Sequence, residues 1–135
     1  MKLTKVIALD VGEKRIGVAA AESATKLAYP VTTILVDGSE YVSLQNLIVE
    51  EQADTIVVGY PRNQQGEPTM QTKSVELFVE KLHLMGISSV YQDESLTSVA
   101  AEKYLQSRRK NYTKADVDAY AATIILTDYM ETHYA

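Results

Sequence analysis

The first part of the chain alternates short apolar runs with turn residues, a pattern typical of consecutive β-strands. The apolar runs cover residues 6–9, 16–21 and 28–36. The first run closes at Asp10-Val11-Gly12, and the charged turn Glu13-Lys14-Arg15 leads into the second. Asp37-Gly38 ends the third run with turn chemistry. We therefore predict three consecutive strands joined by tight connections.

From residue 39 onward, the apolar spacing indicates helices that alternate with strands. Helices are predicted behind Ser39 as an N-cap, around residues 75–82, and over residues 98–106 and 115–130. Strands are predicted at residues 55–58, where Gly59 stops the run, and at residues 87–91. The order βββαβαβαα predicts an α/β fold with a mixed five-stranded sheet, in which three antiparallel strands precede two crossover strands, flanked by helices.

Composition narrows the chemistry that this fold can carry. The 135 residues include no cysteine, which excludes disulfides, thiolate nucleophiles and Cys-ligated metals. The 13 Lys and Arg against 18 Asp and Glu give a net charge of -5, so a nucleic-acid partner needs a local patch or a metal. The first apolar run is broken too soon for a signal peptide, and none approaches the ~20 apolar residues of a membrane span. We expect a cytoplasmic protein with no membrane partner.

Carboxylates stand where two of the predicted strands end. Asp10 closes the first strand and is followed by Gly12, which lets other backbone approach closely. Asp93 and Glu94 end a later strand in the same way. An isolated Asp-x-Gly is also common as a turn carboxylate. If the later strand lies beside the first, however, these strand ends meet.

Asp118 is the third candidate, within the last predicted helix. Ala121 and Ala122 lie three and four residues further on, so this face of the helix can approach a sheet closely. The alternative is that Asp116 and Asp118 simply favour the positive end of the helix dipole.

Three converging carboxylates would need a cation among them. Each pair at 4 Å repels by about 1 to 4 kcal/mol, depending on the effective dielectric. Oxygen ligands without nearby Cys or His favour Mg²⁺ or Mn²⁺ over Zn²⁺. Two such ions about 3.5 to 4 Å apart can activate a water and stabilise the leaving oxygen of a phosphodiester.

Four segments in order resemble the YqgF (RuvX) family, Holliday junction resolvase-like proteins that are also assigned as pre-16S rRNA nucleases. The segments are LDVGEKRIGVA at residues 9–19, VVGYPRNQQG at residues 57–66, DESLTS at residues 93–98 with Ala101-Glu102, and residues 114–122 around VDAYAA. The resemblance covers nearly the whole chain. It implies a single RNase H-like domain over residues 1–135.

The resemblance also implies a metal-binding acidic triad of Asp10, Asp118 and either Glu94 or Asp93, with two Mg²⁺ or Mn²⁺ ions. Adjacent residues of a strand point to opposite faces, so only one of the pair can face the site. We favour Glu94, whose longer side chain reaches further from a strand end. Ser95 stands where the family usually has Arg, which removes a charged partner for phosphate or carboxylate.

Several side chains are candidates for contacting the substrate. They are Lys14 and Arg15 in the first turn, Arg62 and Tyr60 in the segment after the fourth strand, Lys73, and the cluster Arg108-Arg109-Lys110. The cations could bind phosphates, and Tyr60 could stack on a base. The alternative is that they are solvated surface or, for the cluster, a helix end.

These features predict a metal-dependent nuclease that acts on structured RNA, with the 5′ end of the 16S rRNA precursor as the substrate that the resemblance implies. One alternative is a nuclease for branched DNA such as Holliday junctions. Another is a non-catalytic module that binds RNA or the ribosome. The sequence leaves open whether the protein is a monomer or a homodimer.

Overall fold

A five-stranded mixed sheet forms the centre of the computed structural model, which describes residues 4–61, 67–94, 103, 104, 106, 107 and 113–134. The elements are β1 (Lys5–Val11), β2 (Arg15–Glu22), β3 (Tyr29–Leu35), α1 (Glu40–Glu51), β4 (Thr55–Pro61), α2 (Met70–Leu84), β5 (Val90–Glu94) and α4 (Lys114–His133). The strand order is β3-β2-β1-β4-β5. The first three strands pair antiparallel, and β4 and β5 are parallel to β1. The predicted mixed sheet is confirmed.

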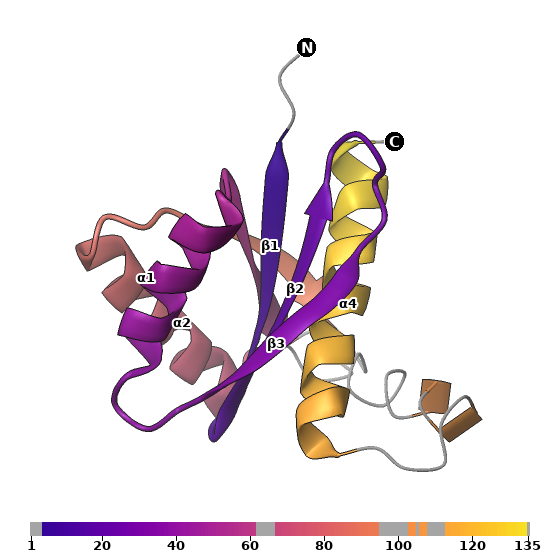
Figure 1. Cartoon of the computed structure of the whole chain (residues 1–135). Helices are drawn as coiled ribbons and strands as arrows, with labels where there is room; N and C mark the ends of the chain where they lie inside the picture. The colour runs from indigo at the N-terminus through magenta and orange to yellow at the C-terminus, as the bar shows by residue number, and fades with distance from the viewer. Residues whose placement is uncertain (1–3, 62–66, 95–102, 105, 108–112, 135) are drawn as a thin grey trace.

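Helices cover both faces of this sheet. Figure 1 shows α1 and α2 on one face and α4 on the other. The central strand β1 is therefore buried on both sides from Val6 to Val11, which explains its nearly continuous apolar run. Alternate β1 residues enter different cores: Ile7 and Leu9 pack on the α1 and α2 side, and Val6 and Ala8 on the α4 side.

Small residues of β2 bring α4 close to the sheet. Gly17, Ala19 and Ala21 are alternate residues of β2, and Ala19 and Ala21 belong to the core beneath α4. The helix meets them with small residues of its own, since Ala121 and Ala122 are fully buried. A polar contact adds to this packing, because the Thr33 hydroxyl donates to the carbonyl of Ala115 at 2.8 Å.

Two predicted strand boundaries are wrong. β4 does not stop at Gly59 but continues to Pro61, since its last residues pair with β5 up to Glu94. The predicted strand at residues 87–91 begins only at Val90. Gly86 has a positive φ of 85°, and the amide of Ile87 still donates to the carbonyl of Leu82. The chain is therefore still leaving α2 at residue 87.

The helices agree with the predictions except in one cap. Ser39 precedes α1, but its side chain caps no amide and its hydroxyl donates instead to Asp37. Thr113 forms a capping box with Asp116 at the start of α4. Of the helix predicted over residues 98–106, only residues 103, 104 and 106 are described, and these are helical. Within the described ranges, no helix is long and apolar enough to cross a membrane.

Candidate active site

Asp10 lies near the end of β1, on the face that α4 covers. Asp10 is only 7% exposed to solvent. Gly17 is its partner on β2, and on the other side Gly59 follows Val58, which pairs with Leu9. Asp10 is therefore flanked by a glycine on each neighbouring strand.

The two glycines leave the space that the site needs. A Cβ on Gly17 would stand 1.9 Å from the carbonyl oxygen of Asp118, so α4 rests directly on the backbone of β2. A Cβ on Gly59 would stand 2.8 Å from Oε2 of Glu94 and 2.6 Å from Cδ1 of Ile125. From the sequence, Gly59 was predicted only to end a strand and Gly17 was given no role, although a glycine inside a strand signals a close approach.

Glu94 reaches Asp10 across Gly59. The strand beside β1 is β4 rather than β5, so the strand that ends at Asp93 and Glu94 does not adjoin the first. Two strand spacings separate β5 from β1, about 10 Å. A glutamate over a glycine spans this gap, and the Glu94 and Asp10 carboxyl groups share a hydrogen bond.

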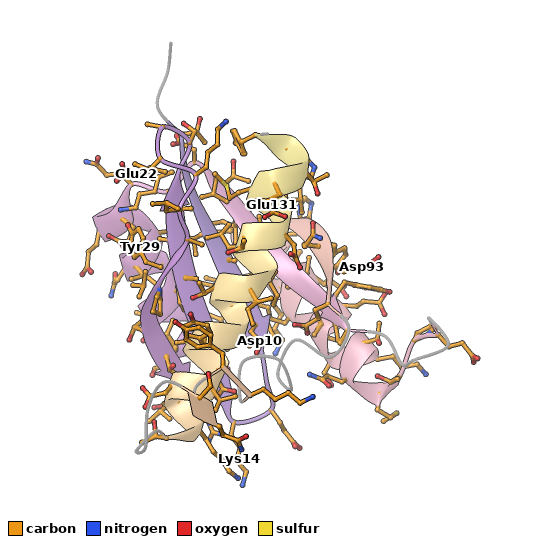
Figure 2. All side chains as sticks on the ribbon, turned by 90° about the vertical axis from the view of Figure 1, so that its right-hand side faces the viewer. Asp10, Lys14, Glu22, Tyr29, Asp93 and Glu131 are labelled. Carbon is orange, nitrogen blue, oxygen red and sulfur yellow. The ribbon has the colours of Figure 1, made fainter. Side chains whose placement is uncertain are left out.

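Asp93 points away from this pair. It lines an open cavity of about 490 Å³ together with Tyr60, Glu76, Tyr91 and Gln92. Figure 2 shows Asp10 beside α4 and Asp93 further out on the edge strand. Of the two adjacent acids, the structure therefore brings Glu94 to Asp10.

Burial changes the protonation of the pair. Desolvation, together with the neighbouring charge of Asp10, raises the pKa of Glu94 from 4.5 to about 9. Desolvation and the charge of Asp118 raise the pKa of Asp10 to about 6, although the hydrogen bond with Glu94 opposes this shift. Both carboxyl groups therefore hold a proton more tightly than free ones, and the larger rise in pKa falls on Glu94.

Asp118 belongs to the same face but has a cationic partner. Nε of Arg15, the first residue of β2, donates to Oδ2 of Asp118 at 2.7 Å. The side chains are 26% and 24% exposed, so the ion pair is largely shielded from water. Arg15 was predicted to contact the substrate, and its contact with Asp118 was not predicted, because the two residues are 103 positions apart in the chain.

The donor set of this face fits a hard divalent cation. Its potential ligands are carboxylate oxygens, which suit Mg²⁺ or Mn²⁺. In the described part of the chain, however, no three acidic or histidine side chains are close enough together to hold one ion. Asp118 faces Arg15 instead.

The other predicted substrate residues are spread over the surface. Lys14 is exposed at the tip of the β1–β2 turn, and Lys73 is exposed on α2. Tyr60 is half-buried; its ring lies 4.6 Å from that of Tyr91, and its hydroxyl donates to Glu76 at 3.4 Å. The remaining candidates and the departure from the family pattern lie outside the described residues: Arg62, Ser95, Arg108, Arg109 and Lys110.

Solved structures with this fold include DNA junction resolvases. The chain superposes on Thermus thermophilus RuvC in complex with a Holliday junction substrate with a TM-score of 0.56, at 11% identity and over 98% of each chain. It superposes on the fowlpox virus Holliday junction resolvase with a TM-score of 0.53, at 14% identity, over 96% of this chain and 99% of that one. Such low identity shows the fold alone. The molecule thus has the RNase H-like α/β fold of these proteins, with acidic residues grouped on one face of its sheet.

Sequence similarity identifies the family within this class. The model of the RuvX family, described as Holliday junction resolvase, matches residues 4–132, and the chain belongs to this family. A relative from Rippkaea orientalis is 34% identical over 137 residues, covering 98% of this chain and 99% of its own length. One from Chloroflexus aurantiacus is 39% identical over 131 residues, covering 93% and 86%. Both carry the name "Putative pre-16S rRNA nuclease".

Proposed function

We propose that this protein is a metal-dependent nuclease that hydrolyses phosphodiester bonds at the 5′ end of the 16S rRNA precursor. The observation that carries the proposal is the pairing of the buried Asp10 with the half-buried Glu94 on the face where α4 supplies Asp118. Two carboxyl groups held this closely, one of them shielded from water, add little stability to a fold, so the arrangement points to chemistry. The names of the two relatives support the RNA substrate.

Asp10, Glu94 and Asp118 are the proposed metal ligands. Mg²⁺ or Mn²⁺ ions, two in the proposed site, would supply an activated water and stabilise the leaving oxygen. When an ion binds, Glu94 would release its proton so that its carboxylate can coordinate the metal. Asp10 would supply a second carboxylate at the centre of the face. We expect the protein to work in the cytoplasm, where ribosomal RNA is processed.

The test is cleavage of an RNA oligonucleotide that carries the 5′ leader of the 16S precursor, with and without Mn²⁺ or Mg²⁺. Asp10→Asn should abolish metal-dependent cleavage while the circular dichroism spectrum stays that of the wild type. Glu94→Gln should do the same. The matched control is Asp93→Asn, which changes the neighbouring acid in the other cavity and should retain cleavage. Wild-type rates in the Asp10→Asn protein would refute the proposed site.

Branched DNA is the second candidate substrate. The description of the family model supports it. The same protein should therefore be assayed on a four-way DNA junction of equal nucleotide concentration. Faster cleavage of the junction than of the RNA would move the assignment to DNA. Metal-independent binding of the RNA with cleavage of neither substrate would favour the non-catalytic binding module.

A further inference from the structure

Arg15 and Asp118 form a tight ion pair at the candidate active site. The described residues contain one other ion pair, Lys5–Glu51, at 3.4 Å and far from this face. The Arg15–Asp118 distance is 2.7 Å. Arg15 lies at the start of β2 and Asp118 in the first turns of α4, so the pair joins the sheet to the helix directly over the site.

The contact uses only part of each group. Arg15 donates through Nε, and in the described structure its two terminal nitrogens have no hydrogen-bond partner. Asp118 accepts on Oδ2, and its Oδ1 likewise has no partner there. A guanidinium presents five N–H donors, so Arg15 retains donors that match a phosphate.

The pair sits beside further negative charge. Asp10 pairs with Gly17 of β2, and a Cβ on Gly17 would stand 1.9 Å from the carbonyl oxygen of Asp118, so the two acids lie close together on this face and repel each other. Without a metal, Arg15 is the cation among the described residues that contacts Asp118, and it offsets part of this repulsion. A divalent ion bound by Asp118 would supply the same compensation more strongly. It would also leave Arg15 beside another positive charge.

We propose that Arg15 changes partners: it holds Asp118 while the metal site is empty and turns to a phosphate of the nucleic acid once a divalent ion binds Asp118. The proposal rests on the proposed function, because it takes Asp118 as a metal ligand. Arg15 is thus a positioning residue in the empty site and a substrate contact in the loaded one. Metal and nucleic acid should therefore bind cooperatively.

The first measurement is metal affinity without nucleic acid. Calorimetry with Mn²⁺ should give about tenfold tighter binding to Arg15→Met than to the wild type, because the competing positive charge is gone. Lys14→Met is the matched control: it removes the adjacent, exposed cation, which does not contact Asp118. We expect its Mn²⁺ affinity to stay within about twofold of the wild type. Equal or weaker binding by Arg15→Met would overturn the exchange.

The second measurement is the salt dependence of binding to a labelled RNA hairpin by fluorescence anisotropy. Each phosphate contact contributes about 0.7 to 0.9 to the slope of log K against log salt. With Ca²⁺, which takes the same oxygen ligands, the slope of the wild type should exceed that of Arg15→Met by about one contact. Without metal the two slopes should agree. Lys14→Met should change the slope equally in both conditions, or not at all.

Asp118→Ala provides a variant that does not depend on the folding of Arg15→Met. It frees Arg15 without any metal, so its metal-free slope should rise by about one contact to the wild-type value in Ca²⁺. An unchanged slope in Asp118→Ala would overturn the proposal. If the wild type cleaves RNA and binds Mn²⁺ but the salt slopes of RNA binding are the same with and without metal, only the proposed change of partner by Arg15 is refuted. If the wild type binds no Mn²⁺ at millimolar concentration, the proposed function fails with it.

Discussion

Replacing Gly17 by alanine tests how closely α4 must approach the sheet. The added Cβ would lie 1.9 Å from the carbonyl oxygen of Asp118 and 2.3 Å from its carbonyl carbon. Since real Cβ contacts essentially never fall below 3.0 Å, the helix backbone must retreat by about 1.1 Å. Overpacking of this kind costs about 1 to 3 kcal/mol, and we expect the upper end because backbone atoms cannot rotate away.

Urea unfolding followed by far-UV circular dichroism measures this cost. Thermal unfolding should show a fall of about 10 °C for a loss of about 3 kcal/mol. Gly38→Ala is the control because its added Cβ would meet no atom within 4 Å. The φ of 100° at this position means that the substitution strains the local backbone without pushing any element away. We expect it to cost about 1 kcal/mol and to leave Mn²⁺ affinity unchanged. If Gly17→Ala were no less stable than Gly38→Ala, the inferred contact between α4 and β2 would be wrong.

Three further predictions concern the acids and the cap of α4. Because the folded protein holds the proton of Glu94 more tightly than the unfolded chain, stability should fall as pH rises from 4.5 towards 9, by at most about 1.4 kcal/mol per pH unit. Urea titrations at several pH values should show this slope, and Glu94→Gln should flatten it; identical slopes would contradict the raised pKa. Asp118→Asn should lower the pKa of Asp10 from about 6, measured by carboxyl NMR titration, and a rise would exclude repulsion between the two. Thr113→Ala should cost about 1 kcal/mol in unfolding free energy by removing the capping box, and a loss below a few tenths would refute that role.

Much of the fold follows from local pattern. The buried strand β1 reads as a continuous apolar run, and α2 shows the spacing of Val75, Phe78 and Leu82, all three of which are buried. The mixed sheet of three antiparallel strands and two crossover strands also follows, because hairpins and crossovers restrict the topology, but the position of β4 between β1 and β5 was not predicted. Strand ends are less predictable. β4 passes through Gly59 because its partner β5 continues there, and a local pattern contains no information about that partner.

The candidate site, like the fold, could be predicted only in part from the sequence. Asp10 and Glu94 were recognisable as acids at strand ends, and of the two adjacent acids Glu94 lies beside Asp10, while its role as a metal ligand stays a prediction. The Arg15–Asp118 pair depends on how α4 docks on β2, which no short segment of sequence records. The roles of Gly17 and Gly59 likewise depend on atoms from other elements, namely the backbone of Asp118 and the carboxylate of Glu94.

The distance along the chain between Arg15 and Asp118 has a consequence for biosynthesis. A ribosome makes β1 to β5 before α4, so the strands of a growing chain can pair before α4 is present. At that stage Asp10 is not covered by the helix and Arg15 has no Asp118 to pair with. The face that carries Asp10 therefore takes its described form only after the whole sheet has been synthesised and α4 has emerged and docked.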